Sequence, residues 1–282
     1  MKITFTTFQI GSEMTLDELI DLAHATGCAG IELRVSDNYK RGAEHVNKGE
    51  KPDAYQHAYK HGVEITCTDE ERRLIRRKIE DNYLEIVSIT TGFMFHYTNQ
   101  EDRIKNIAGA KEACKLAYDL GCKRIRVFGN IIPDGVNAQD CVDYVTAAVT
   151  EVADFALPLG VDVMLEMHGQ YNYWGYSLAV MEQANRTNMG LLYNCDKRDL
   201  VGGSMRETFG RVKKYVRHVH MHEICDSYPY QQLFEELVNM DYQGYVSAEI
   251  KPSSDPVRVL SLYNKAVNLY IELAKYTMGK KN

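Results

Sequence analysis

The chain lacks the features that mark several large classes of protein. Its 282 residues include seven cysteines but no Cys-x-x-Cys pair, so no disulfide framework is predicted and reduced thiols are expected. No apolar run approaches the length of a membrane span, and the first residues show no signal-peptide pattern. A net charge of −6 disfavours a protein that grips a nucleic-acid backbone. We therefore expect a cytoplasmic protein that binds neither membranes nor nucleic acids.

The chain also has no glycine fingerprint for a dinucleotide and no Pro-, Ser- or Gly-rich linker. What recurs is a helical pattern, a glycine and a short apolar segment. The glycines are Gly27, Gly121, Gly160 and Gly244. Glycine at this place supplies the left-handed residue that ends a helix. The repetition predicts strict alternation of helices and strands.

Eight apolar segments have the length and composition of strands. They cover 2–8, 29–35, 84–91, 123–128, 161–167, 190–194, 216–221 and 245–250. Helices are predicted near 15–26, 69–82, 100–120, 138–158, 177–188, 204–214, 229–240 and 255–277. Each unit is about 35 residues long, the usual size of a βα repeat. The prediction is an α/β protein with a single (β/α)8 TIM barrel over 1–282, whose active site lies at the C-terminal ends of the strands.

One connection is longer than the others. Residues 36–67 lie between the second predicted strand and its helix, and they are polar and rich in Tyr, His and Lys. Long loops in compact barrels are commonly lids or binding loops. We expect this segment, with a small helix near 53–60, to lie over the barrel mouth.

Polar side chains stand at the ends of the last four predicted strands. They are Glu166 and His168 in VMLEMHG, Asn194 and Asp196 in LLYNCDK, His220 and His222 in VRHVHMHEI, and Glu249 and Lys251 in YVSAEIK. Side chains two residues apart share one face of a strand, so one member of each pair can point into a common volume. Two carboxylates, one imidazole and one amide suit Mn²⁺, Mg²⁺, Co²⁺ or Zn²⁺.

Other polar residues have more than one interpretation. Glu32 and Arg126 are predicted to pair with each other inside the barrel, and His218 is expected to be structural. Arg34, one layer higher, could reach a phosphate or a carboxylate. Trp174, in the aromatic run GQYNYWGY, could stack on a sugar ring or pack as an ordinary loop residue.

Several of these segments resemble one known group of proteins. GIELR, RIRVFG, VMLEMHG, VRHVHMHE and GYVSAEI are similar to segments of the xylose-isomerase-like barrel superfamily, which contains sugar isomerases and epimerases, some dehydratases and the abasic-site endonucleases. The resemblance implies one divalent metal ion held by residues of strands five to eight. Carried over to this chain, the ligands are Glu166, Asn194, His220 and Glu249.

The chain departs from the family pattern at strand six. Asn194 stands where relatives carry an aspartate, and Lys197 stands where they carry histidine or asparagine. An uncharged amide predicts weaker metal binding, unless Asp196 compensates. A metal-free site, in which Lys197 or Lys251 supplies the positive charge, remains an alternative.

The resemblance implies a metal-dependent isomerase or epimerase of a sugar, keto-sugar or polyol that works through an enediolate. Glu166 and Glu249 would transfer the proton next to the carbonyl. His168 and His222 would bind the substrate at the rim, as would Lys251.

Three other functions follow from the same fold. A dehydratase, hydratase or decarboxylase of a keto-sugar or keto-acid would use the same site. An abasic-site endonuclease is disfavoured, because the sequence Cys225-Asp226-Ser227 lacks the histidine that such enzymes place there. A sugar-binding barrel without catalysis would explain Asn194. Assembly into a homo-oligomer is compatible with each of these functions.

Overall fold

The computed structural model describes residues 1–36, 59–200, 204–225 and 227–279 of the chain. Eight parallel strands form a closed barrel in sequence order, and β1 pairs with β8 to close it. The strands are β1 (Lys2–Thr6), β2 (Gly30–Arg34), β3 (Glu85–Met94), β4 (Arg124–Phe128), β5 (Asp162–Glu166), β6 (Met189–Asn194), β7 (Val216–Met221) and β8 (Tyr245–Ala248).

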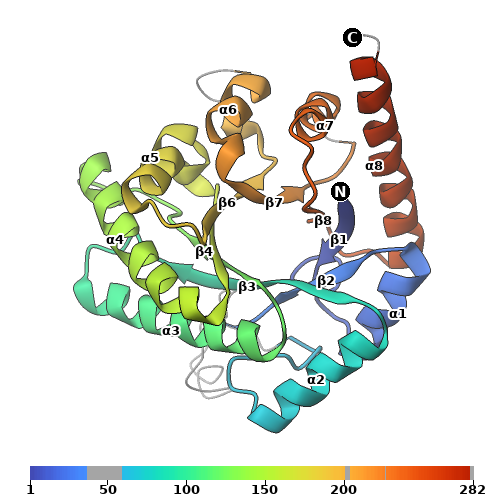
Figure 1. Ribbon diagram of the computed structural model, residues 1–282, viewed down its shortest axis with the longest axis horizontal. Coiled ribbons are helices and arrows are strands. Elements are labelled where there is room, and N and C mark those ends of the chain that lie inside the picture. The colour runs from blue at the N-terminus through green and yellow to red at the C-terminus, as the bar shows by residue number, and fades with distance from the viewer. Residues whose placement is uncertain (37–58, 201–203, 226, 280–282) are drawn as a thin grey trace.

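A ring of helices surrounds this barrel (Figure 1). The helices are α1 (Leu16–Thr26), α2 (Asp69–Asp81), α3 (Gln100–Asp119), α4 (Ala138–Ala156), α5 (Trp174–Ala184), α6 (Met205–Val212), α7 (Tyr230–Asn239) and α8 (Pro256–Gly279). Short 3-10 turns are η2 (Leu157–Leu159), η3 (Gly169–Asn172), η4 (Lys197–Leu200) and η5 (Lys213–Tyr215). The predicted TIM barrel is therefore confirmed. The clearest differences in bounds are that α5 begins at Trp174 and that β8 ends before Glu249.

Local sequence fixes where the helices begin and end. Thr15, Thr68 and Ser204 each form a capping box with a glutamate three residues later, which satisfies backbone N–H groups at the start of the helix. Gly27, at φ 72°, ends α1 in the left-handed conformation, which glycine adopts without steric cost. The strand then follows after only a few residues, as the recurring pattern predicts.

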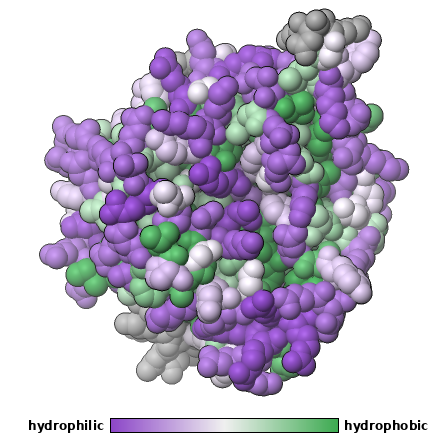
Figure 2. Space-filling model, viewed as in Figure 1, coloured by the Kyte–Doolittle hydropathy of each residue, from purple (hydrophilic) through white to green (hydrophobic). Residues whose placement is uncertain are grey.

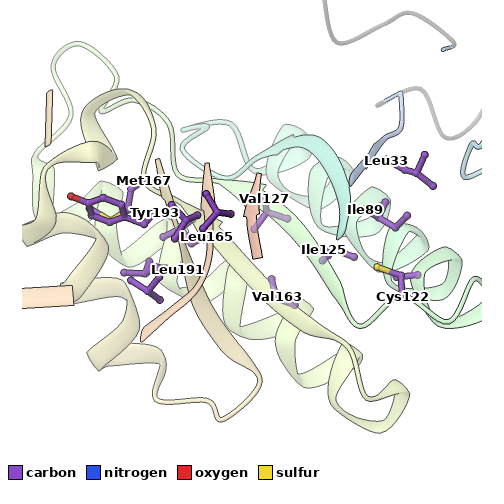
Figure 3. Packing of buried hydrophobic residues seen from close by; sticks show 14 of the residues in the cluster. Leu33, Ile89, Cys122, Ile125, Val127, Val163, Leu165, Met167, Leu191 and Tyr193 are labelled. Atoms are coloured by element: carbon purple, nitrogen blue, oxygen red, sulfur yellow. The ribbon is translucent and has the colours of Figure 1, made fainter. Parts of the chain in front are cut away.

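The two faces of each strand differ in chemistry. Outward side chains such as Val127 and Leu165 (Figure 3) belong to one apolar cluster that also includes helix residues such as Val149 of α4. Inward side chains are largely polar and buried. They include Thr4, Thr6, Glu32, Arg34, Ser88, Thr90, Arg126, Glu166, Asn194, His218, His220 and Ser247. The outer shell thus holds the barrel together and leaves its interior available for polar chemistry.

A polar cluster lies at the N-terminal base of the barrel, beside a cavity of about 320 Å³ that Lys2, Glu85 and Tyr245 help to line. Lys2 Nζ lies 2.5 Å from Glu85 Oε1, and the Tyr245 hydroxyl donates a hydrogen bond to the same carboxylate. The guanidinium of Arg124 lies 5.7 Å from the centre of the Tyr245 ring. Lys2, Glu85 and Tyr245 satisfy one another at this end, whereas Arg124 Nε is buried without a hydrogen-bond partner among the described residues.

The long connection after β2 is only partly described. Residues 37–58, which include the predicted small helix and most of the predicted lid, lie outside the described residues. The segment 59–67 belongs to the packed structure rather than to a lid, because Val63 and Ile65 are buried. Glu64 accepts hydrogen bonds from the backbone and hydroxyl of Ser36, both at 2.8 Å.

The surface is mainly hydrophilic on the face shown in Figure 2, with small scattered apolar areas. Within the described ranges, no helix has the length and apolar character needed to cross a bilayer.

Candidate active site

Three elements at the C-terminal ends of the strands bring two carboxylates to one imidazole. Glu166 ends β5, His220 lies near the end of β7 and Glu249 directly follows β8. His220 Nδ1 lies 3.5 Å from Glu166 Oε1 and 3.2 Å from Glu249 Oε2, and all three atoms lie within 4.8 Å of one another. Ligands bonded to one ion at about 2.0–2.2 Å lie about 3 to 3.5 Å apart. The spacing of this triad fits a single metal ion.

Asn194 completes the set of possible ligands. Its Nδ2 donates a hydrogen bond to Glu166 Oε1 at 3.1 Å, while its Oδ1 is buried and has no hydrogen-bond partner among the described residues. Nor do His220 Nδ1 and Glu249 Oε2 complete a well-aligned hydrogen bond with any side chain that the structure describes. Buried acceptors without donors are costly. The residues present therefore fit a divalent cation.

Glu32 of β2 orients the imidazole from the opposite side. Its two oxygens lie 2.8 Å from His220 Nε2 and 2.9 Å from His218 Nε2, and Thr90 donates a third hydrogen bond at 2.9 Å. A carboxylate on the far nitrogen of a histidine is the usual support of a metal-binding imidazole, because it fixes the tautomer. In the neutral ring, a proton on Nε2 leaves the Nδ1 lone pair for a cation between Glu166 and Glu249, whereas in the protonated ring Nδ1–H points toward these carboxylates.

The predicted pairing of Glu32 with Arg126 is wrong. Arg126 Nη1 instead lies 2.8 Å from Glu166 Oε2. The strand order explains this difference, because β4 and β5 are neighbours with Phe128 opposite Glu166, whereas β3 separates β2 from β4. His218, predicted to be structural, is buried in the barrel interior as the second histidine on Glu32.

The charges at this site shift its protonation equilibria. Burial alone would raise the pKa of Glu166, but the charge of Arg126 and the neighbouring histidines lower it to about 2. Burial alone would also lower the pKa of His220, but the charge of Glu32 and the close carboxylates of Glu166 and Glu249 raise it well above its usual value. Carboxylates on both sides of one imidazole thus favour positive charge at this point.

Two further histidines stand near the site. His168 Nδ1 lies 2.9 Å from Asn130 Oδ1, and its ring centre lies 5.1 Å from that of Phe128. His222 Nδ1 lies 3.9 Å from Glu249 Oε2, and its side chain is 26% exposed. Both imidazoles therefore lie close to the triad, since His168 acts electrostatically on Glu166 and His222 approaches Glu249.

A cavity of about 330 Å³ opens beside the triad. It is lined by residues that follow β1, β6, β7 and β8, namely Gln9, Cys195, Asp196, Lys197, His222, Glu223, Tyr228, Glu249 and Lys251. Glu249 is thus the triad member on the cavity wall. The structure brings Lys251 together with His222 and Glu249, as the sequence predicts for residues of one rim.

Trp174 and Arg34, which the sequence predicts to bind substrate, are not among the residues that line this cavity. Trp174 begins α5 and lies 5.1 Å from the guanidinium of Arg211 on α6, so its described contacts do not bring it to the carboxylates. Arg34 is buried inside the barrel, and its charge helps to lower the pKa of Arg126. Its backbone N–H donates a hydrogen bond to Thr7 at 2.8 Å.

Sequence reasoning missed two residues of the site. Asn130, which adopts φ 70°, positions His168, and no local pattern in the sequence marks it. Phe8 has a ring centre 6.4 Å from that of His220 and 5.8 Å from the guanidinium of Arg126. The two-residue period from Thr4 through Thr6 would have placed Phe8 on the inward face.

Comparisons with known proteins agree with this architecture. The chain is 24% identical over 167 residues to the 2-oxo-tetronate isomerase of Haemophilus influenzae, covering 54% of this chain and 65% of that relative. A second curated relative, from Xenopus laevis, is 25% identical over 177 residues, which cover 64% of its length. The matches thus span slightly less than two thirds of these relatives.

Solved structures share the fold at lower sequence identity. L-ribulose 3-epimerase superposes with a TM-score of 0.78 and 16% identity, covering 100% of this chain and 98% of that one. The IOLI protein, solved with a zinc atom, gives a TM-score of 0.71 and 13% identity, covering 97% and 98%. The family described as xylose isomerase-like TIM barrel matches residues 20–266, and this chain belongs to that family.

Proposed function

We propose that the protein is a divalent-metal-dependent isomerase or epimerase of a small sugar, keto-sugar or polyol. The observation that carries this proposal is the triad of Glu166, His220 and Glu249, whose ligand atoms all lie within 4.8 Å of one another. The similarity to a 2-oxo-tetronate isomerase and to an L-ribulose 3-epimerase supports the same class of reaction.

The metal ligands in this proposal are Glu166, His220 and Glu249, with Asn194 Oδ1 as a fourth. The IOLI protein, which has the same fold and was solved with a bound zinc atom, supports a metal ion in this chain. When bound, the ion would act as a Lewis acid that polarises the substrate carbonyl. Oxygen and imidazole ligands suit Mn²⁺, Mg²⁺, Co²⁺ or Zn²⁺.

Glu249 is the better placed of the two proposed bases. Arg126 engages one oxygen of Glu166 and Asn194 donates to the other. Glu249 instead lines the cavity, where its carboxylate can take the proton from the carbon next to the carbonyl. Glu166, on the other side of His220, would return a proton to the opposite face or to the neighbouring carbon after taking that proton from solvent, because its low pKa leaves it ionised at rest.

Rim residues would hold the substrate in this proposal. Asn130 fixes the ring of His168, which would bind a hydroxyl or the carbonyl. His222 Nε2 is buried and has no hydrogen-bond partner among the described residues, so it is available to a substrate oxygen. Lys251 on the cavity rim would attract a carboxylate or a phosphate.

Proton exchange tests the proposal directly. The metal-loaded protein is incubated in D₂O with a panel of ketoses and 2-oxo acids, and NMR follows loss of the proton next to the carbonyl. Exchange with isomer formation supports the proposal, whereas loss of water or CO₂ would favour the lyase alternative. Absence of both exchange and metal binding would overturn it.

A further inference from the structure

Helix α8 is apolar on two opposite faces. Its buried face contains Leu260, Tyr263, Val267 and Ala274 and packs against α1 and α7. A surface helix of a barrel normally needs only this one apolar face, with polar residues on the other. The exposed apolar side chains on the other face of α8 therefore need an explanation.

A row of large apolar side chains lies along that outer face. Leu262, Leu269, Leu273 and Tyr276 are exposed by 58%, 71%, 49% and 60%. Val259, which packs partly against the core, and the partly buried Ala266 lie at the edge of this face and continue the row with alternating steps of three and four residues. Single exposed apolar residues are ordinary, but this 3.5-residue period is the pattern by which one helix packs along another.

We propose that this face of α8 pairs with α8 of a second copy of the chain, antiparallel and about a two-fold axis. The row matches itself in that arrangement. Val259 then lies opposite Tyr276, Leu262 opposite Leu273, and Ala266 opposite Leu269, each contact occurring twice. A surface that complements itself is what a two-fold interface requires.

The charges beside the row select the same arrangement. Lys265 directly precedes Ala266, and Glu272 directly precedes Leu273. Both charged residues therefore lie on the same side of the row. In the antiparallel register, Lys265 of each copy lies beside Glu272 of the other. In a parallel pair these charges would instead face Tyr270 and Thr277. Glu272 now accepts a hydrogen bond from Lys275 at 2.8 Å, an exposed pair that contributes little to stability.

The position of α8 leaves this interface accessible. Figure 1 shows α8 as one outer edge of the molecule, with its C-terminal end reaching past α7. Because the row lies opposite the buried face, a second copy would not cover the cavity at Glu249. Association should therefore leave the proposed catalytic site open.

The first test measures mass in solution by sedimentation equilibrium. The unaltered chain should be dimeric, and Leu269→Lys should shift it to monomer by placing a charge in the centre of the interface. Leu74→Lys is the matched control, because Leu74 is 53% exposed on α2. It should remain dimeric, and thermal melting should show both variants folded.

The second test exchanges the charges. Lys265→Glu and Glu272→Lys should each weaken dimerisation by at least about tenfold, because each creates two like-charge contacts. The double variant should recover most of that loss. A monomeric unaltered chain at about 100 µM, or a dimer that Leu269→Lys leaves intact, overturns the interface. Failure of the double variant to recover overturns the antiparallel arrangement.

Discussion

The two ends of the barrel interior use similar residues in different ways. At the base, Lys2, Glu85 and Tyr245 contact one another directly. At the mouth, Glu166, His220 and Glu249 also lie close together, yet buried acceptor atoms of His220 and Glu249 lack well-aligned donors among the described residues. The Glu85 carboxylate at the base has its donors in Lys2 and Tyr245, whereas the carboxylates at the mouth need another positive group.

This difference separates structural polar clusters from functional ones. Both ends combine carboxylates with nitrogen bases, although the Lys2–Glu85 pair is half exposed, so residue types alone do not distinguish them. What distinguishes them is whether each acceptor has a donor. Substitutions at the mouth should therefore affect ligand binding and turnover, while substitutions at the base should affect only stability.

The largest expected effect follows from removing the proposed base. Glu249→Gln should lower kcat by at least about 10²-fold, since an amide cannot take the proton. Glu166→Gln should also abolish most turnover. Glu85→Gln at the base is the matched control and should retain nearly full activity. An active Glu249→Gln enzyme, measured on the substrate found by proton exchange, would remove Glu249 from catalysis.

Metal binding should respond next. His220→Ala removes the only nitrogen ligand and should abolish tight binding in a titration against a chelator. Glu32→Gln leaves all proposed ligands in place, but it should weaken affinity by about 10- to 100-fold because the imidazole loses its orienting carboxylate. His24→Gln, on the exposed side of α1, should change nothing. Full metal affinity in His220→Ala would exclude the proposed centre.

Acidification should lower the free energy of unfolding through the buried His61. Burial lowers the pKa of His61 to about 4, although the backbone of Arg34 acts in the opposite direction. The unfolded chain, with its pKa near 6.5, then binds the proton more tightly, so stability falls as the pH drops through this range. The loss begins below about 6.5, is complete below about 4 and reaches about 2 kcal/mol at pH 5.

Urea unfolding of His61→Gln across this pH range tests the assignment. The variant should lose that part of the acid dependence, whereas His24→Gln should keep it. An unchanged slope of stability against pH in His61→Gln would show that another group carries the dependence.

A smaller change is expected at Asn194. Replacing its amide by the carboxylate of aspartate should raise metal affinity by up to about tenfold, because charged oxygens bind hard cations more tightly. Asp196→Ala is the control and should leave affinity unchanged. If Asp196→Ala destroys binding and Asn194→Asp has no effect, the ligand of β6 lies two residues further along the chain.

The smallest effect is expected at the base. Glu85→Gln should cost about 0.5 kcal/mol of unfolding free energy, because the pair with Lys2 is half exposed and screened by solvent. Denaturant unfolding measures it, and added salt should reduce the difference between the two proteins. A loss of metal binding in this variant would contradict the separation of base and mouth.

The sequence predicts the fold well because its signals are local. Apolar runs, capping residues such as Thr15, and glycines such as Gly27 each act within a few residues of the chain. The triad was predictable too, since parallel strands bring their ends to one side. The contacts of Glu32 and Arg126 were not, because a long inward side chain can reach several strands and the two-residue period fixes only its face. The contact of Trp174 with Arg211 depends likewise on how α5 packs against α6.

In the proposed metal site, the orientation of His220 by Glu32 would make tight metal binding depend on the order of folding. The proposed ligands come from β5 to β8, but Glu32 comes from β2, and the two parts of the ring meet where β1 joins β8 across 243 positions of sequence. Contacts between such distant residues form late. A refolding chain that has assembled only β5 to β8 would contain the proposed ligands, but the His220 ring would not yet be oriented by Glu32. The last 10- to 100-fold of metal affinity should therefore appear after helical structure, when β1 joins β8.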